Sequence, residues 1–181
     1  PAVPLVGDEL SCSYTGGADA DGDALEEAYA WSVAGAPADG SSSSLAGVFA
    51  KGEEVICTLA LDDGNGGTAS ASASAIVGNT LPVAELSSLS PDPATTESVL
   101  EAAASVTDAD AADAGSLSLS YAWFVEGSEV VGETGESLGS SHFTKGQAVR
   151  VEVVPGDGDG TGEMVQAELV IANTPPSEPA P

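Results

Sequence analysis

The chain has 181 residues and a formal net charge of −26, because 29 acidic side chains are opposed by only three Lys and Arg. Such a chain repels the phosphates of nucleic acids and anionic lipids, so we expect neither as a partner. No apolar stretch approaches the roughly 20 residues of a membrane-spanning helix, so we expect no direct membrane insertion. The 22 Gly, the 11 Pro and an aromatic content of only 4% favour small β-domains with few large core residues.

The sequence contains an internal repeat. The triplet Tyr29-Ala30-Trp31 recurs as Tyr121-Ala122-Trp123, and Lys51-Gly52 recurs 94 residues later as Lys145-Gly146. The Asn-Thr pair that begins at Asn79 recurs at the same offset. These matches predict two related modules of about 90 residues each.

The repeat also predicts the module boundaries. The first module covers residues 1–78, a linker covers 79–82, and the second module covers 83–172. Residues 173–181 are predicted to form a further linker and the start of a following module. Residues 83–90 have no counterpart in the first module, so its first strand is predicted to be missing or cut.

Alternating apolar and polar residues predict the strands in chain order. Short strands, frequent turns and no helical periodicity predict an all-β fold of two tandem β-sandwiches. In the first module, the predicted inward-facing residues are Leu10, Cys12 and Tyr14, then Leu25, Tyr29, Trp31 and Val33, then Val55, Cys57, Leu59 and Leu61, then Ala71, Ala73, Ala75 and Val77. In the second, they are Leu100, Ala102 and Ala104, then Leu117, Leu119, Tyr121, Trp123 and Val125, then Val149, Val151, Val153 and Pro155, then Val165, Ala167, Leu169 and Ile171.

The order Cys12, Trp31, Cys57 resembles the immunoglobulin fold, in which a disulfide joins the two sheets beside a tryptophan. The resemblance implies a Cys12–Cys57 disulfide and an oxidising compartment. The alternative is a pair of free core thiols. The second module has Ala102 and Val151 at the matching positions, so the fold does not depend on the bridge.

The order of motifs, from the aspartates of residues 19–23 through Tyr-Ala-Trp and Lys-Gly to residues 62–65 and 79–82, covers both modules. It resembles the tandem immunoglobulin-like, cadherin-like repeats of large bacterial and archaeal surface proteins. The resemblance implies two immunoglobulin-like β-sandwiches arranged end to end, at the cell surface or outside the cell. It also implies calcium at the junctions between modules, where Asn79 would approach the loops of the second module.

Acidic loops are the candidate metal sites. Alternate carboxylates on a turning loop can converge on one hard cation, and Ca²⁺ takes six to eight oxygen ligands in flexible geometry. The alternative is that Asp-Gly pairs only form turns. In the second copy Ala111 and Ala112 replace the tight Gly-Asp, which predicts a weaker site or a changed ligand set. The candidate ligands are Asp19, Asp21, Asp23, Asp63, Asn65 and Asn79, and then Asp108, Asp110, Asp113, Asp157 and Asp159.

No arrangement of residues predicts catalysis. The single histidine, His142, lies beside Ser140 and Ser141 without an oxyanion feature. We therefore expect a non-catalytic segment of a secreted or surface-attached fibre or stalk, with further copies of the same repeat or chain as partners. One alternative is an adhesin module that recognises a cell-surface glycan or protein. Another is a filament subunit in which residues 174–181 of one chain supply the missing first strand of the next.

Overall fold

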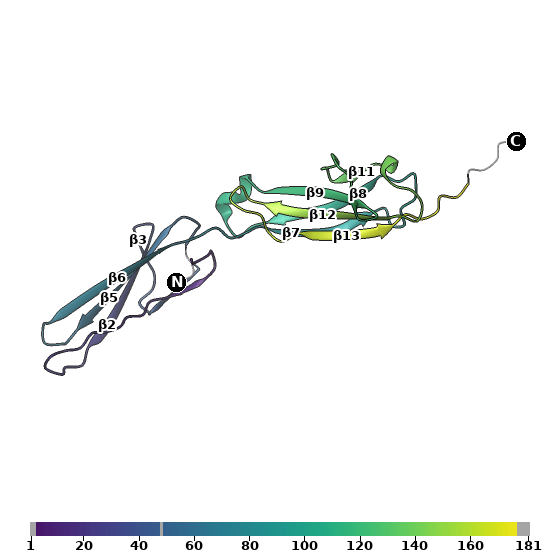
Figure 1. Cartoon of the computed structure of the whole chain (residues 1–181). Coiled ribbons are helices and arrows are strands. Elements are labelled where there is room, and N and C mark those ends of the chain that lie inside the picture. Colours follow the sequence, from purple (N-terminus) through teal and green to yellow (C-terminus); the bar gives the residue numbers. More distant parts are fainter. Residues whose placement is uncertain (1–2, 48, 177–181) are drawn as a thin grey trace. The chain divides into compact units, whose positions relative to one another are not determined.

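The computed structural model describes residues 3–47 and 49–176, and the last five residues of the predicted following module lie outside this range. The chain divides into two compact units. Unit 1 comprises Pro1–Thr80 with Ala109–Ala112, and unit 2 comprises Leu81–Asp108 with Asp113–Pro181 (Figure 1). Both units are built from antiparallel strands, as the alternating sequence predicted.

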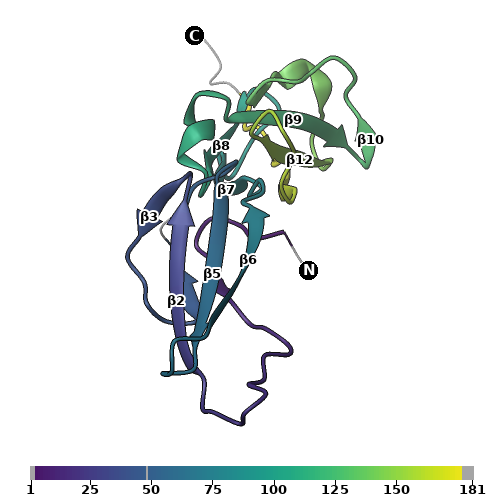
Figure 2. The ribbon, with the colours of Figure 1, turned by 90° about the vertical axis from the view of Figure 1, so that its left-hand side faces the viewer.

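Unit 1 contains a four-stranded sheet of order β3-β2-β5-β6, seen face on in Figure 2, and a two-stranded sheet of order β1-β4. The large sheet carries the first Tyr-Ala-Trp motif on β2. The strands of unit 1 are β1 (Glu9–Ser11), β2 (Glu26–Val33), β3 (Ala36–Ala38), β4 (Ser44–Ala46), β5 (Glu54–Asp62) and β6 (Thr68–Ile76).

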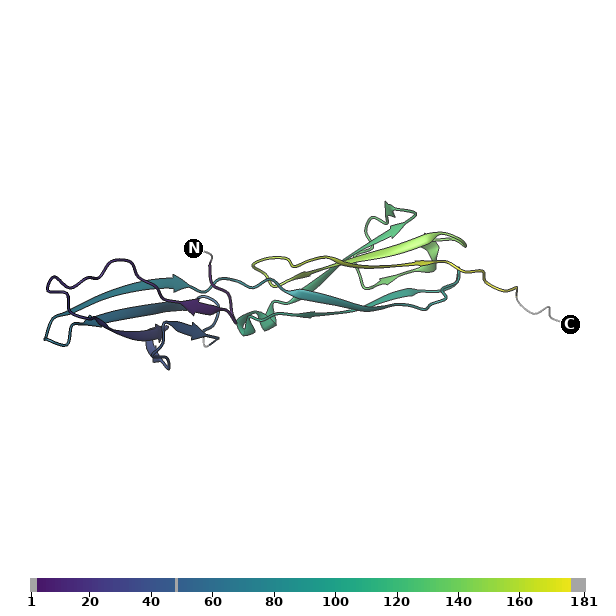
Figure 3. The same ribbon diagram turned by 90° about the horizontal axis from the view of Figure 1, so that it is seen from below.

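Unit 2 contains a four-stranded sheet of order β10-β9-β12-β13 and a three-stranded sheet of order β11-β8-β7. Figure 3 shows the teal β7 and β8 as one layer against the yellow-green β12 and β13. The elements of unit 2 are β7 (Val83–Ser90), β8 (Leu100–Thr107), the 3-10 helix η1 (Ala111–Gly115), β9 (Ser118–Val125), β10 (Ser128–Glu129), β11 (Ser137–Leu138), the 3-10 helix η2 (Ser140–His142), β12 (Ala148–Gly156) and β13 (Val165–Val170).

The two units share one strand plan. Trp31 of β2 lies opposite Cys57 of β5, and Trp123 of β9 lies opposite Val151 of β12. In the second layer, the β1–β4 pair of unit 1 corresponds to the β8–β11 pair of unit 2. Two facing sheets with this order are an immunoglobulin-like β-sandwich. The predicted fold class, all-β with two immunoglobulin-like sandwiches, is confirmed.

Each core is centred on its tryptophan. Trp31 is 6% exposed and Trp123 is fully buried, and each indole N–H donates a hydrogen bond to a backbone carbonyl, that of Ser42 at 3.0 Å and that of Gly135 at 2.9 Å. Every second residue of β5 and β12 is buried, as the alternation predicted. Burial of one large aromatic side chain contributes a few kcal/mol, so the repeated motif organises each fold.

The predicted disulfide between Cys12 and Cys57 is confirmed. Cys12 directly follows β1, and its backbone N–H donates to the carbonyl of Ser43 at 2.7 Å, while Cys57 lies in β5 of the other sheet. The bridge therefore joins the two layers of unit 1. Unit 2 holds its layers together by side-chain packing, with Ala102 and Val151 both buried at the equivalent positions.

Unit 1 differs from the prediction in two places. The early strand was expected to continue through Cys12 and Tyr14, but β1 ends at Ser11 and Tyr14 is 39% exposed. The alanines Ala71 and Ala73 of β6 were expected to face the core, but both are exposed. The reason is the same in both places: in unit 2 the equivalent strands β8 and β13 contact β7, and no described residue of unit 1 forms a strand at that position.

Candidate metal centre

Three aspartates of unit 2 form a compact acidic group. Asp108 follows β8, Asp113 lies in η1 and Asp157 follows β12, and each offers a carboxylate oxygen within 4.8 Å of the others. Asp113 is 8% exposed and Asp157 is 1% exposed, whereas Asp108 is half-buried. The loops that follow β8 and β12, which belong to different sheets, therefore place their carboxylates together at one end of the sandwich. We call these three residues the acidic triad.

A tight turn orients Asp157. Its Oδ1 accepts hydrogen bonds from the backbone N–H groups of Asp159 at 2.7 Å and Gly160 at 2.6 Å. Gly158, which lies between Asp157 and Asp159, has a φ of 95°, a conformation that glycine adopts without steric cost. The Asp-Gly repeat thus forms a turn, as its composition predicts, and the same turn holds the carboxylate of Asp157 in a buried position.

The helix η1 orients Asp113. The carbonyl of Asp113 accepts hydrogen bonds from the backbone N–H of Ser116 at 2.8 Å and from its Oγ at 3.0 Å, which close the helical turn. Ala111 and Ala112 are small and exposed, so the chain can coil tightly here while Asp113 turns inward. Ala111 and Ala112, which predicted a weaker site or a changed ligand set, are thus part of the short helix that buries Asp113.

The triad concentrates negative charge on side chains of which two are buried. Two like charges at this separation repel by roughly 3 kcal/mol at an effective dielectric constant of about 20. Bound cations or protons are the usual means of stabilising such a group.

The donor set of the triad suits a hard cation. All its ligand atoms are carboxylate oxygens, which Ca²⁺ and Mg²⁺ prefer, whereas zinc sites use mainly nitrogen and sulfur. Ca²⁺ also tolerates flexible coordination geometry, which suits carboxylates that come from two loops. The residues present therefore fit Ca²⁺.

In unit 1 the first acidic loop is held by hydrogen bonds from its own backbone to the side chain of Asp19. Asp19 Oδ1 accepts hydrogen bonds from the N–H groups of Asp21 at 2.8 Å and Asp23 at 3.2 Å. The side-chain amide of Asn65 donates to Asp23 Oδ2 at 2.9 Å, so the two predicted ligand loops of unit 1 do meet.

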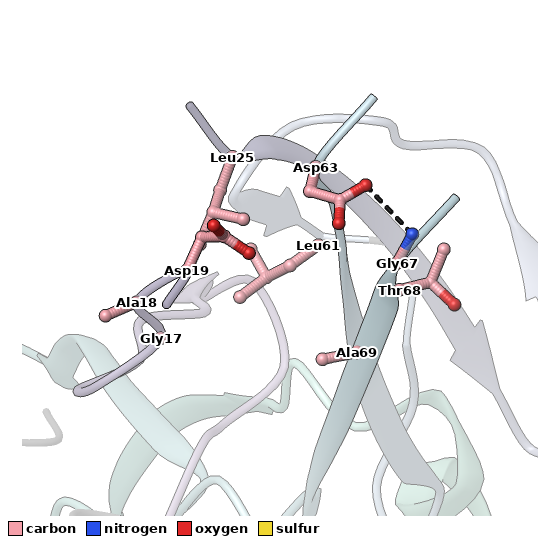
Figure 4. A pocket seen from close by; sticks show the side chains of 9 residues that line it. All are labelled: Gly17, Ala18, Asp19, Leu25, Leu61, Asp63, Gly67, Thr68 and Ala69. Carbon is pink, nitrogen blue, oxygen red and sulfur yellow. Dashed lines mark hydrogen bonds between the residues drawn. The ribbon is translucent and has the colours of Figure 1, made fainter. Parts of the chain in front are cut away.

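The second loop of unit 1 is organised by Asp63. Its Oδ1 accepts hydrogen bonds from the N–H groups of Asn65 at 2.7 Å and Gly67 at 2.9 Å, and these bonds, that of Asn65 first, lower the pKa of the Asp63 carboxyl. Asp63 and Asp19 border an open hollow of about 230 Å³ (Figure 4). The remaining lining residues are Gly17, Ala18, Leu25, Leu61, Gly67, Thr68 and Ala69.

The structure brings together three of the residues that the sequence proposed as ligands. Within residues 3–47 and 49–176, the acidic triad is the single group of three or more His, Cys, Asp or Glu side chains at this spacing. Asp110 lies outside it, and its Oδ2 accepts a hydrogen bond from the N–H of Thr80 at 2.6 Å. Asp159 is exposed, and Asn79 is half-buried. The assignment of calcium ligands stays a prediction for all of these residues.

The fold of the chain is that of two immunoglobulin-like β-sandwiches built on a repeated sequence pattern. In the described parts of the chain, no helical segment has the length and apolarity needed to cross a lipid bilayer.

No protein-family model and no curated protein matches the sequence. Among solved structures, the chain is similar to the three N-terminal domains of the Highly Immunogenic Outer Capsid protein (Hoc) of bacteriophage RB49. The identity is 17% and the TM-score is 0.35, and the match covers 94% of this chain and 56% of that one.

Proposed function

We propose that the chain is a structural, non-catalytic segment of a secreted or surface-attached fibre or stalk whose immunoglobulin-like repeats are stiffened by calcium. The observation that carries the proposal is the acidic triad, because it brings carboxylates from two loops together while burying two of them. A cation held by Asp108, Asp113 and Asp157 would tie the end of β8, the helix η1 and the end of β12 to one point. Loops joined in this way would lose conformational freedom, which would stiffen the repeat.

The setting outside the cell is supported by the Cys12–Cys57 disulfide, since such bridges persist in oxidising compartments. Calcium in that setting is abundant enough for sites of modest affinity, on the order of 10⁻⁴–10⁻³ M for extracellular modules. The high negative charge favours the attraction of cations and keeps the chain soluble. Further copies of the same repeat or chain are the proposed partners.

An adhesin function is less well supported by the placement of the aromatic residues. Both tryptophans are buried in the cores, and Tyr29 and Tyr121 are half-buried beside them. Recognition of glycans and proteins commonly uses exposed aromatic side chains, and these four residues are used for packing instead.

The proposed calcium binding is tested by isothermal titration calorimetry of the full chain with CaCl₂, compared with MgCl₂ at equal ionic strength. We expect a saturable calcium signal that is lost or at least about tenfold weaker in the Asp113→Asn variant, because one charged ligand is removed. Circular dichroism of the variant checks that it folds. A wild-type chain without a calcium signal, or a signal unchanged in Asp113→Asn, would refute binding at the triad.

A further inference from the structure

The first strand of unit 2, β7, begins between the two loops that carry the acidic triad. Val83 of β7 lies opposite Thr107, and Asp108 of the triad is the next residue after Thr107. Pro82, which directly precedes Val83, is fully buried and its backbone contacts the loop that joins β12 and β13. Asp157 of the triad lies in that same loop. The start of β7 is therefore held from two sides by segments that also supply carboxylates to the triad.

The contact between Pro82 and the β12–β13 loop is made at a glycine. A Cβ atom at Gly162 would overlap the backbone oxygen of Pro82 and would lie 3.0 Å from Pro155 Cγ. The overlapping atom belongs to the backbone, so it could not rotate away as the end of a flexible side chain could. Pro82 and Pro155 are both fully buried, which leaves the two segments little room to separate. The absence of a side chain at Gly162 is thus what allows the two backbones to approach so closely.

Backbone hydrogen bonds connect Gly162 to the carboxylate of Asp157. The N–H of Gly162 donates to the carbonyl of Pro155 at 3.0 Å, which closes the base of the loop. Inside the loop, the N–H of Asp157 donates to the carbonyl of Gly160 at 3.2 Å, and the N–H of Gly160 donates to Asp157 Oδ1 at 2.6 Å. Gly160 lies only two residues before Gly162. A displacement of Gly162 would therefore be transmitted to the group that orients the Asp157 carboxylate.

On its other side, the start of β7 holds the end of β8. The register of the pair runs without a break from Val83 opposite Thr107 to Leu86 opposite Ala104. Thr107 is the last residue of β8, so the position of Asp108 depends on the pairing of Thr107 with Val83. If Val83 moved away, Asp108 would follow an unpaired strand end.

We propose that a calcium ion at the acidic triad clamps the start of β7, so that calcium binding and the docking of Pro82 and Val83 stabilise each other. The inference rests on the proposed function, because it requires a cation at the triad. A cation held by Asp108 and Asp157 would fix the end of β8 and the β12–β13 loop, and these are the two segments that hold the start of β7. The effect is reciprocal: whatever factor calcium adds to the docking of β7, docked β7 adds to the affinity for calcium.

The clamp acts at the weakest point of the β7–β8 pair. Strand ends open more easily than strand centres, and Val83 and Thr107 form the end of this antiparallel pair. A pull on the chain before Pro82 would separate the two strands at this end first. A cation that fixes both neighbouring segments would oppose that separation, which suits a structural repeat. Gly162 is a positioning residue in this account, because it acts on the cation site through the backbone of its loop.

Hydrogen exchange of the full chain, in CaCl₂ and in chelator at equal ionic strength, tests the clamp directly. We expect calcium to slow the exchange of residues 83–85 by at least about tenfold, with a much smaller change at residues 88–90. Residues 88–90 are the internal control, because they lie at the other end of the same strand and pair with residues 101–103. Equal slowing at both ends would contradict the clamp, since it would mean that calcium only stabilises unit 2 as a whole.

Gly162→Ala and Gly139→Ala provide a matched pair of variants in unit 2. The added methyl group displaces Pro82 or the loop in Gly162→Ala, whereas at Gly139 it meets no atom within 4 Å and the φ of −72° suits alanine. Both variants retain all three carboxylates of the triad. Calorimetric titration with CaCl₂ should show an affinity at least about tenfold lower in Gly162→Ala and unchanged in Gly139→Ala. Calcium should also no longer slow the exchange of residues 83–85 in Gly162→Ala.

The outcomes separate the clamp from the calcium proposal on which it rests. A wild-type chain without a calorimetric calcium signal would refute both. Calcium binding of equal affinity in wild type and Gly162→Ala would refute the clamp alone, even if residues 83–85 exchanged faster in the variant, because that pattern is what a merely structural glycine would give. If Gly162→Ala does not fold, the comparison of residues 83–85 with residues 88–90 in the wild type still decides.

Discussion

The carboxylates of Asp113 and Asp157 approach within 4.8 Å of each other, although both side chains are buried and they come from different loops of unit 2. Most buried carboxylates in proteins are paired with a cation or share a proton. Asp108 lies beside them, so three carboxylates converge in unit 2. This convergence distinguishes the chain from a β-sandwich whose loops are acidic but whose carboxylates lie apart.

The triad predicts a contrast between two neighbouring aspartates. Asp157→Asn should weaken calcium binding by at least about tenfold, because it removes a buried charge from the ligand set. Asn retains an oxygen that can accept the backbone hydrogen bonds of Asp159 and Gly160, so the turn should persist. Asp159→Asn is the matched control, since Asp159 is exposed and outside the triad. Calcium titration calorimetry measures both, and equal losses in the two variants would contradict the assignment.

The disulfide should stabilise unit 1 alone. Replacing Cys12 and Cys57 together by alanine opens a loop with a sequence separation of 45, which the chain-entropy estimate values at about 4 kcal/mol. Hydrogen exchange of the full chain should show faster exchange in β2 and β5, and unchanged exchange in β9 and β12. Equal acceleration in both units would mean that the bridge acts beyond the sandwich that contains it.

In unit 1 the carboxylate of Glu27 accepts hydrogen bonds from Tyr14 Oη at 2.6 Å and from Tyr29 Oη at 2.7 Å, and this arrangement predicts a spectroscopic signature. Hydrogen bonds to Glu27 raise the pKa of the Tyr14 and Tyr29 phenols and lower the pKa of the Glu27 carboxyl. In Glu27→Gln both phenols should ionise at lower pH than in the wild type, as followed by ultraviolet absorbance. Tyr121 has a pKa raised mainly by burial, so its titration should not move and serves as the internal control.

Asp63 predicts an acid-sensitive loop in unit 1. Hydrogen bonds from the Asn65 and Gly67 backbone lower the folded-state pKa of its carboxyl below the ordinary value of 3.8. The ionised form is therefore favoured by folding, and this contribution is present above pH 3.8 and is lost as the pH falls through the folded-state pKa. Thermal unfolding in chelator should show Asp63→Asn less stable than wild type near neutral pH, with the difference shrinking in acid. A constant difference would rule out this linkage.

Much of the fold could be predicted from the alternation of apolar and polar residues along the sequence. The second Tyr-Ala-Trp motif predicted a strand with Trp123 in the core, and Trp123 is fully buried in β9. The alternation around Val149, Val151 and Val153 likewise predicted the buried face of β12. These predictions succeed because side-chain direction alternates along a strand regardless of what surrounds it.

Two features could not be predicted from the sequence, because they depend on contacts between residues far apart in the chain: the exposure of Ala71 and the choice among the candidate ligands. The exposure of Ala71 is set by the absence of a covering strand among the described residues of unit 1, and the sequence of β6 carries no sign of that. Asp108, Asp113 and Asp157 were all named as candidate ligands, but so were Asp110 and Asp159. Only the folded backbone of η1 and of the turn after β12 decides which of them converge.

The most direct test of the calcium proposal is the thermal unfolding of the full chain in calcium and in chelator, at equal and low ionic strength. Binding to the folded state alone raises the unfolding midpoint progressively with calcium concentration, and saturation at about 100 times Kd adds about 2.7 kcal/mol. The predicted result is a higher midpoint in calcium, with the increase lost in Asp113→Asn. A midpoint that is the same in calcium and in chelator would contradict the proposal that calcium stabilises this chain.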